Sequence, residues 1–138
     1  MEKYNIHELK IENFDERFPF WNFINENRKQ ELVLEIENNN RRMFVCKINN
    51  EYVGGLSITK EGESQLNISY FIVRDDFRNR GIGGSLIDFI FHYAEMCGIH
   101  EILIGVYSDN LGAKRLYKRK GFIEIHEADN KITLLKKL

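Results

Sequence analysis

Arginines and glycines gather in one segment of the second half of the chain, between a predicted strand and a predicted helix. The segment is Val73-Arg74-Asp75-Asp76-Phe77-Arg78-Asn79-Arg80-Gly81-Ile82-Gly83-Gly84-Ser85. The first N–H groups of a helix have no partner within the helix and carry a partial positive charge. Glycines let a ligand approach such a backbone closely. The segment therefore predicts a site for a phosphate or pyrophosphate. The alternative is a tight turn that only packs the strand against the helix.

Two common phosphate loops do not fit this segment. A P-loop closes on Gly-Lys-Ser/Thr, whereas Gly83 is followed by Gly84 and Ser85 without a lysine. The dinucleotide-binding fingerprint requires a third glycine where this chain has Leu86. A plain nucleotide is therefore not the favoured ligand.

A second segment, residues 106–122, combines a polar start with an aromatic helix. Asp109 and Asn110 are residue types that cap helix N-termini. In the helix that follows, Ala113, Leu116 and Tyr117 share one face. A tyrosine at such a position is usually a core residue with a bonded hydroxyl.

Strands and helices of clear periodicity position these two segments. Strands are predicted at 4–11, 43–48, 52–59, 66–73, 101–106, 122–125 and 131–135, and helices at 18–27 (with Asp15 as N-cap), 29–38, 81–97 and 111–120. A hairpin turn is expected at Asn49-Asn50-Glu51. This order predicts an α/β or α+β fold with helices on both faces of a mixed sheet.

One strand and one helix have an apolar periodicity that assigns individual side chains to a face. In strand 66–73, strict alternation places Leu66, Ile68, Tyr70 and Ile72 on one face and Asn67, Ser69, Phe71 and Val73 on the other. In helix 81–97, the predicted apolar stripe consists of Ile82, Leu86, Ile90, Tyr93 and Cys97. Gly98 then follows as a C-terminal capping glycine.

Composition limits the class of protein. The chain has 138 residues and a net charge of −1, without the basic excess of a nucleic-acid binder. No apolar stretch approaches the roughly 18 residues of a membrane span, and the polar N-terminus is no signal peptide. We expect a single soluble, cytoplasmic domain over 1–138, monomeric or homodimeric. Cys46 and Cys97 lie in apolar runs, far from other ligand residues, and are expected to be buried and to bind no metal.

The two segments resemble the sequence motifs of a known family. Arg78-Asn79-Arg80-Gly81-Ile82-Gly83 resembles the Arg/Gln-x-x-Gly-x-Gly/Ala acyl-CoA motif of the GNAT superfamily of N-acetyltransferases. Asn110-x-x-Ala113-x-x-Leu116-Tyr117-x-x-x-Gly121-Phe122 is similar to that family's second motif. The resemblance implies a mixed, mostly antiparallel central sheet of about six to seven strands. It also implies transfer of an acetyl group from acetyl-CoA to a primary amine of a small molecule or protein by direct attack, without a metal.

The resemblance also implies roles for individual residues. The coenzyme pyrophosphate would be held by the backbone around Arg78, Asn79, Arg80, Gly81, Ile82, Gly83, Gly84 and Ser85. The pantetheine arm would pair with the main chain of Phe71, Ile72 and Val73, where this strand splays from strand 102–106. Asn110 would hydrogen-bond the same arm. Tyr117 would lie beside the sulfur as general acid.

The base that deprotonates the amine is not evident. A lysine-like ammonium with a pKa of about 10.4 is only about 0.04% neutral at pH 7. Strand 66–73 contains no carboxylate, which leaves Ser69 or Asn67 to position a water, Asp109 to act as base, or a mechanism that relies on water alone. The absence of a carboxylate from this strand also keeps an alternative open, in which the chain is an inactive coenzyme A-binding sensor or docking domain.

Overall fold

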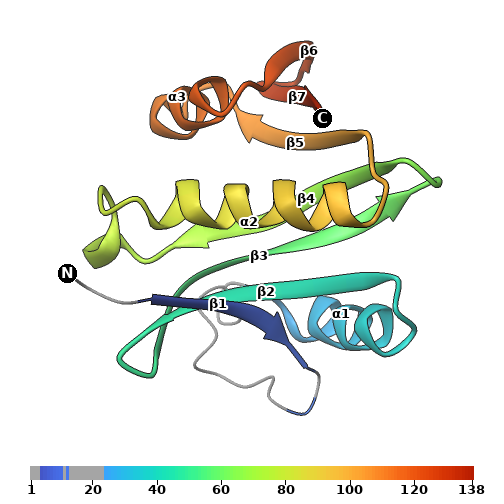
Figure 1. The fold of residues 1–138 in the computed structure, drawn as a ribbon, viewed down its shortest axis with the longest axis vertical. Helices are drawn as coiled ribbons and strands as arrows, with labels where there is room; N and C mark the ends of the chain where they lie inside the picture. Colours follow the sequence, from blue (N-terminus) through green and yellow to red (C-terminus); the bar gives the residue numbers. More distant parts are fainter. Residues whose placement is uncertain (1–3, 11, 13–23) are drawn as a thin grey trace.

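A computed structural model describes residues 4–10, 12 and 24–138, and its centre is a seven-stranded sheet (Figure 1). The strands are β1 (Tyr4–Leu9), β2 (Arg41–Ile48), β3 (Glu51–Glu61), β4 (Gln65–Val73), β5 (Glu101–Tyr107), β6 (Ile123–Ala128) and β7 (Lys131–Lys137). The helices are α1 (Glu26–Glu37), the short 3₁₀ turn η3 (Asp75–Phe77), α2 (Ile82–Met96) and α3 (Leu111–Arg119). The sheet order is β1-β2-β3-β4-β5-β7-β6, and only the β4–β5 pair is parallel. The predicted mixed, mostly antiparallel sheet is confirmed.

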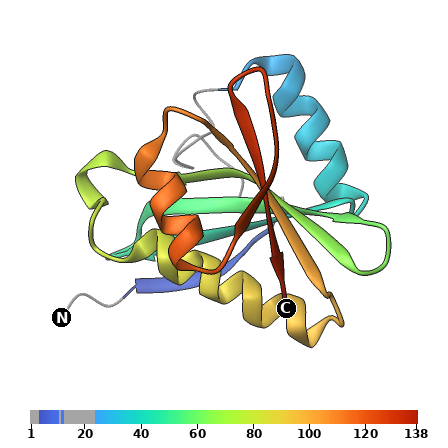
Figure 2. The same cartoon turned by 90° about the horizontal axis from the view of Figure 1, so that it is seen from above.

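Helices cover both faces of this sheet, as predicted. Figure 2 shows α1 on one face and α2 on the other. The larger core lies on the α2 side and includes Leu86, Ile90 and Ile104; α3 packs there through Tyr117. A smaller core lies under α1. Within the described ranges, no helix is both long enough and apolar enough to cross a membrane.

Helix α2 follows its predicted pattern except at its end. Gly81 is the N-cap, with a φ of 83°, and Gly98, with a φ of 74°, follows the C-cap. The Ile99 N–H donates to the Ala94 carbonyl at 2.9 Å, which closes the helix in a Schellman motif. The prediction that Cys97 is buried is wrong: it is the C-cap and is exposed, because the chain leaves the core face there.

Two boundaries near the N-terminus differ from the prediction. Helix α1 begins at Glu26 rather than at residue 29, because the Asn25 side chain accepts a hydrogen bond from the Arg28 N–H at 2.8 Å and caps it. The predicted Asp15 cap and residues 18–23 of the other helix lie outside the described residues. The β2–β3 turn consists only of Asn49 and Asn50, both with positive φ, so Glu51 belongs to the strand.

Strand β4 contains a β-bulge that the alternation pattern did not predict. Ser69 pairs with Ser57, whereas Ile72 pairs with Gly55, so two residues of β4 oppose Leu56 alone. The two are Tyr70, which has a left-handed φ of 51°, and Phe71. An inserted residue exchanges the faces of everything after it. Leu66 and Ile68 therefore share the larger core with Phe71 and Val73, while Tyr70 and Ile72 pack on the α1 side.

Candidate functional site

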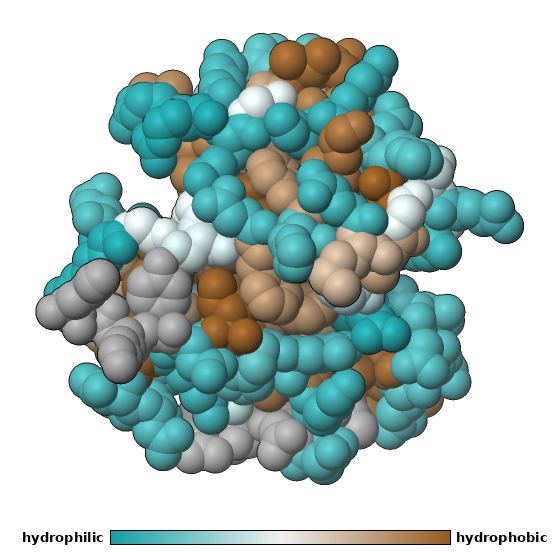
Figure 3. Space-filling view, viewed as in Figure 1, coloured by the Kyte–Doolittle hydropathy of each residue, from teal (hydrophilic) through white to brown (hydrophobic). Residues whose placement is uncertain are grey.

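A cavity of about 390 Å³ opens where β4 and β5 separate. The two strands pair in parallel only from Gln65 and Glu101 to Ile68 and Ile104, and their C-terminal halves have no ladder between them. The cavity lies between the end of β4, the start of α2 and α3. In Figure 3 the surface is notched at the left, between α3 and the start of α2. The volume is in the range of small-molecule pockets, about 300–1,000 Å³.

Most of the predicted site residues line this one cavity. Those that do are Phe71, Ile72, Val73, Arg78, Asn79, Gly81, Ile82, Gly83, Gly84, Asn110 and Tyr117. Arg80 and Ser85 are not among the lining residues; the Arg80 guanidinium lies 4.8 Å from the centroid of the Phe77 ring. Sequence reasoning missed four further lining residues, Phe77, Gly112, Ala113 and Leu116. Arg115 and Arg119 also line the cavity; they belong to the basic run 114–120, which the sequence favours as a solvated face with one member able to meet the coenzyme's 3′-phosphate.

The N-terminus of α2 forms part of the cavity wall. The N-cap, Gly81, makes no side-chain capping bond, so the N–H groups of the first turn keep their capacity to bind an anion. Space for a side chain at Gly83 is tight: a Cβ would lie 3.2 Å from Leu116 Cδ2, which would have to move by a few tenths of an ångström, and in contact with Phe71 Cζ at 3.5 Å. The glycine thus keeps the floor of the cavity open.

Arg78 supports the turn that precedes α2. One of its guanidinium nitrogens lies 3.0 Å from an Asp75 carboxylate oxygen, and its Nε donates to the Val73 carbonyl at 3.5 Å. The side chain is largely exposed and also lines the cavity. Its position allows both turn support and contact with an anion.

The basic residues of α3 divide into two groups. Lys114 and Lys118 lie 3.8 and 3.5 Å from Glu124 Oε1, and Lys120 Nζ lies 2.9 Å from Asp88 Oδ1. In contrast, Arg115 and Arg119 are exposed, line the cavity and form no ion pair with any described residue. Their spacing of four residues places both on one helix face, a signal that the sequence already contained.

Tyr117 places a buried ring and an accessible hydroxyl at the cavity. The residue is 6% exposed, and burial raises its pKa to about 12. Its ring centroid lies 6.1 Å from that of Phe71 and 5.9 Å from that of Phe122. The Tyr117 hydroxyl forms no hydrogen bond with a described residue. Among the described residues, every fully buried side-chain oxygen and nitrogen does have a hydrogen-bond partner, so this hydroxyl is not fully buried. The hydroxyl must therefore open onto the cavity that the residue lines.

Asn110 caps α3 and contributes to the cavity wall. Its Oδ1 accepts a hydrogen bond from the Ala113 N–H at 3.2 Å. The cap thus uses the oxygen of the amide and leaves its NH₂ group as a donor. Asp109, the other candidate cap, is exposed, and its side chain does not cap the helix.

Ser69 and Asn67, the two residues predicted to position a water, do not line the cavity. Ser69 Oγ accepts from Arg41 at 2.8 Å and lies 2.9 Å from Ser57 Oγ. Asn67 is in register with Leu103, in the part of β4 that still pairs with β5. Neither residue lines the cavity, and no Asp or Glu is among the described residues that do.

Comparison with known proteins adds independent evidence. The model of the acetyltransferase (GNAT) family matches residues 4–122. An uncharacterized N-acetyltransferase of Methanocaldococcus jannaschii is 34% identical over 103 residues, which cover 69% of this chain and 45% of that protein. The chain therefore spans about half the length of this curated relative.

Solved structures share the fold at low sequence identity. A GNAT-family acetyltransferase of Staphylococcus aureus superposes with a TM-score of 0.80 at 21% identity, covering 99% of both chains. A probable acetyltransferase of Staphylococcus epidermidis has a TM-score of 0.81 at 16% identity, covering 98% of this chain and 99% of that one. A GNAT-family acetyltransferase of Elizabethkingia anophelis with acetyl-CoA bound has a TM-score of 0.72 at 20% identity, covering 98% of both chains.

Proposed function

The chain belongs to the acetyltransferase (GNAT) family, and from that premise we propose that it transfers the acetyl group of acetyl-CoA to a primary amine by direct attack. The observation that carries the proposal is one cavity lined by two chemically distinct groups. They are the N-terminus of α2, which has no side-chain cap, and the hydroxyl of the buried Tyr117. The amine belongs to a small molecule or to a protein.

The residues around the cavity suit the parts of acetyl-CoA. Its phosphates match the first turn of α2, with Arg115 and Arg119 as unpaired cations on the facing helix. The amides of its pantetheine arm match the end of β4, because Phe71, Ile72 and Val73 have no β5 partner on that edge, where the Val73 carbonyl accepts only a long, 3.5 Å bond from Arg78 Nε. The NH₂ group of Asn110 is a further donor.

Tyr117 acts on the leaving group. Acetyl-CoA supplies an acetyl group on a sulfur that leaves as a thiolate, for which the cysteine pKa of about 8.5 is a guide. Since burial raises the pKa of Tyr117 to about 12, the phenol remains protonated at neutral pH. Full proton transfer to such a thiolate is uphill. The phenol therefore contributes mainly a hydrogen bond that stabilises the charge as the C–S bond breaks.

Among the described residues, no carboxylate of the cavity wall is available to take the proton of the amine. Because no described Asp or Glu lines the cavity, the proton passes to water, or the amine enters already neutral. The rate with an alkylamine of pKa about 10.4 should then rise about tenfold per pH unit between pH 7 and 9. A rate that levels off near pH 7 would instead reveal a base.

The second candidate is a coenzyme A-binding sensor or docking domain without turnover. The lack of a carboxylate among the described lining residues favours it, since the base is the part of the machinery that is not evident. The same cavity and the same anionic ligand serve both functions.

One experiment separates the two functions. Thiol release from acetyl-CoA is measured over a panel of amines with the wild type and with Tyr117→Phe, and coenzyme A binding is measured by calorimetry. Turnover that falls about 100-fold in the variant, with unchanged binding, supports acetyl transfer in which the Tyr117 hydroxyl stabilises the leaving thiolate. If Tyr117→Phe and the wild type turn over at equal rates, Tyr117 does not assist the leaving group. Tight binding without acetylation of any amine favours the sensor.

A further inference from the structure

The bulge residue Tyr70 adopts a backbone conformation that a residue with a side chain rarely adopts. Its φ of 51° lies in the left-handed region, where the Cβ crowds the following carbonyl. Such a residue persists only where its surroundings hold it in place. Tyr70 is held from the face of the sheet opposite the cavity core, where it packs on the smaller core and accepts a hydrogen bond from Arg28.

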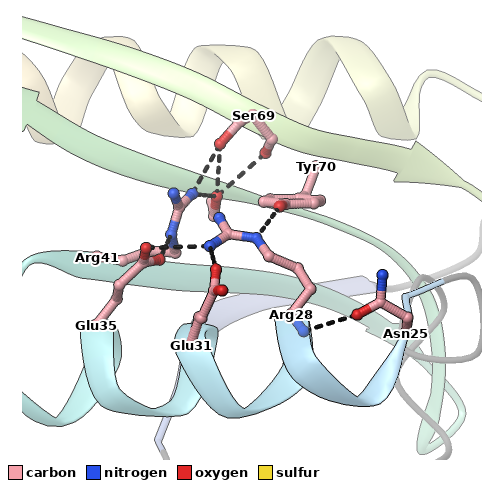
Figure 4. A network of polar contacts seen from close by, with 8 residues as sticks. Asn25, Arg28, Glu31, Glu35, Arg41, Ser69 and Tyr70 are labelled. Carbon is pink, nitrogen blue, oxygen red and sulfur yellow. Dashed lines mark hydrogen bonds and ion pairs between the residues drawn. The ribbon is translucent and has the colours of Figure 1, made fainter.

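Two arginines hold the Tyr70 side chain (Figure 4). Arg28, in the first turn of α1, donates from Nε to the Tyr70 hydroxyl at 2.7 Å, and its guanidinium carbon lies 5.6 Å from the ring centroid. The guanidinium carbon of Arg41, from β2, lies 5.3 Å from the same centroid. A cation at this distance from an aromatic ring is attracted to it. Tyr70 is thus fixed at its hydroxyl and at its ring.

The two arginines are themselves held by a carboxylate of α1. Arg41 Nε donates to Glu35 Oε2 at 2.7 Å, and Arg28 Nη1 donates to Glu35 Oε1 at 3.2 Å. Burial opposes the charge on Glu35, but the bonds and charges of both arginines dominate and hold its pKa below the usual range. Glu35 is therefore a permanent bridge between the arginines and a poor proton acceptor.

Arg41 also fixes the strand register at the residue before the bulge. Its Nη1 donates to Ser57 Oγ of β3 at 2.6 Å and to Ser69 Oγ of β4 at 2.8 Å. These two serines form the last regular β3–β4 pair before the bulge. A slip by one residue would turn every later side chain to the other face. Phe71 would then leave Tyr117, and the free edge of β4 would be reoriented.

We propose that Arg28, Arg41 and Tyr70 form a clamp on the β4 bulge, and that all three are positioning residues for acetyl transfer. The clamp lies on the α1 face of the sheet and sets the conformation of residues 71–73 on the cavity. It aims the Phe71 ring at Tyr117 and presents the unpaired main chain of β4 to the pantetheine arm. This inference rests on the proposed function.

The test is a double-mutant cycle between the clamp and Phe71. Arg28→Met removes the bond to the Tyr70 hydroxyl and one of the two cations beside its ring, and Arg28→Lys keeps a donor and a cation. We expect Arg28→Met to lower kcat/KM for acetyl-CoA about three- to tenfold, and Arg28→Lys to recover most of the loss. In a Phe71→Leu background the same Arg28→Met change should cost less than about twofold, because the route through Phe71 is already lost.

A matched control removes an arginine outside the clamp. Arg42→Met breaks an ion pair with Glu8, 3.3 Å long, between β2 and β1. Its effect on kcat/KM should be small and equal in both backgrounds. If Arg28→Met costs the same factor with and without Phe71, or no more than Arg42→Met, the clamp has no positioning role. Tyr70→Phe, which removes only the hydroxyl, provides a milder variant if Arg28→Met folds poorly.

A readout without turnover separates this inference from the proposed function. The ionisation of Tyr117 is followed by ultraviolet difference titration against the corresponding Tyr117→Phe protein. With the clamp intact the midpoint should lie near 12, and in Arg28→Met it should move toward 10 as the Phe71 ring ceases to cover the phenol. An unchanged midpoint overturns the clamp. A shifted midpoint in a protein that acetylates no amine keeps the clamp and rejects the transferase.

Discussion

The ring of Phe71 stacks on the ring of Tyr117, with centroids 6.1 Å apart and an angle of 29° between the planes. Phe71 comes from β4 immediately after the bulge, and Tyr117 comes from α3. The contact joins the two elements that border the cavity on either side of the β4–β5 separation. The position of the phenol therefore depends on the backbone of β4 as well as on its own helix.

Burial of Tyr117 predicts a loss of stability in alkaline solution. The pKa is about 12 in the folded protein and about 10 in the unfolded chain, so the phenol's contribution is complete below pH 10 and is lost as pH rises toward 12. At pH 11 the loss is about 1.4 kcal/mol. Urea unfolding at pH 8 and pH 11 should show it in the wild type, and Tyr117→Phe should lack this part of the decline. An equal decline in both proteins would contradict the assignment.

Gly83 and Gly84 should respond differently to an added methyl group. In Gly83→Ala the Cβ meets Leu116 and Phe71 in the cavity floor, and we expect coenzyme A binding about tenfold weaker, a loss of about 1.4 kcal/mol. In Gly84→Ala the nearest atom, 3.3 Å away, is Cε of the flexible Lys120, which can move aside. Calorimetry compares the two. A larger effect from Gly84→Ala would place the ligand elsewhere.

The unpaired arginines of α3 should carry the salt dependence of coenzyme binding. Replacing Arg115 and Arg119 by glutamine should weaken binding about tenfold in 20 mM salt and much less in 500 mM, because screening suppresses exposed charge interactions. Lys118→Gln is the control, since that ammonium already pairs with Glu124. Titrations at both salt concentrations test this, and an equal loss from Lys118→Gln would refute it.

The two cysteines should differ in reactivity. Cys97 is exposed, whereas Cys46 is buried in β2, and burial raises the pKa of its thiol to about 11. A disulfide reagent should therefore label one thiol rapidly in the native protein and the second only after unfolding. Cys97→Ser should abolish the rapid phase and change the free energy of unfolding by less than about 0.5 kcal/mol. A rapid phase that survives this substitution would contradict the exposure of Cys97.

Local pattern alone predicted the elements and much of the cavity. The apolar period of α2 and the glycines at 81 and 98 define that helix, because side-chain periodicity and left-handed capping are properties of neighbouring residues. The same holds for the helix that presents Tyr117 and for its N-cap Asn110. The resemblance of two short motifs to a family then implied that these elements form a mixed, mostly antiparallel sheet, although the order of its strands came from the structure.

The tertiary structure alone decided which side chains meet. The bulge places a tyrosine in a conformation that its own preference disfavours, so alternation failed from Tyr70 onward. Its partners Arg28 and Arg41 come from α1 and β2, and no local pattern links them to β4. Likewise, pairing with Glu124 and Asp88 separates three lysines of α3 from its two cavity arginines. Periodicity is set by bonds along the chain, whereas charge pairing and strand register are set by contacts between distant segments, and only the packed fold brings those together.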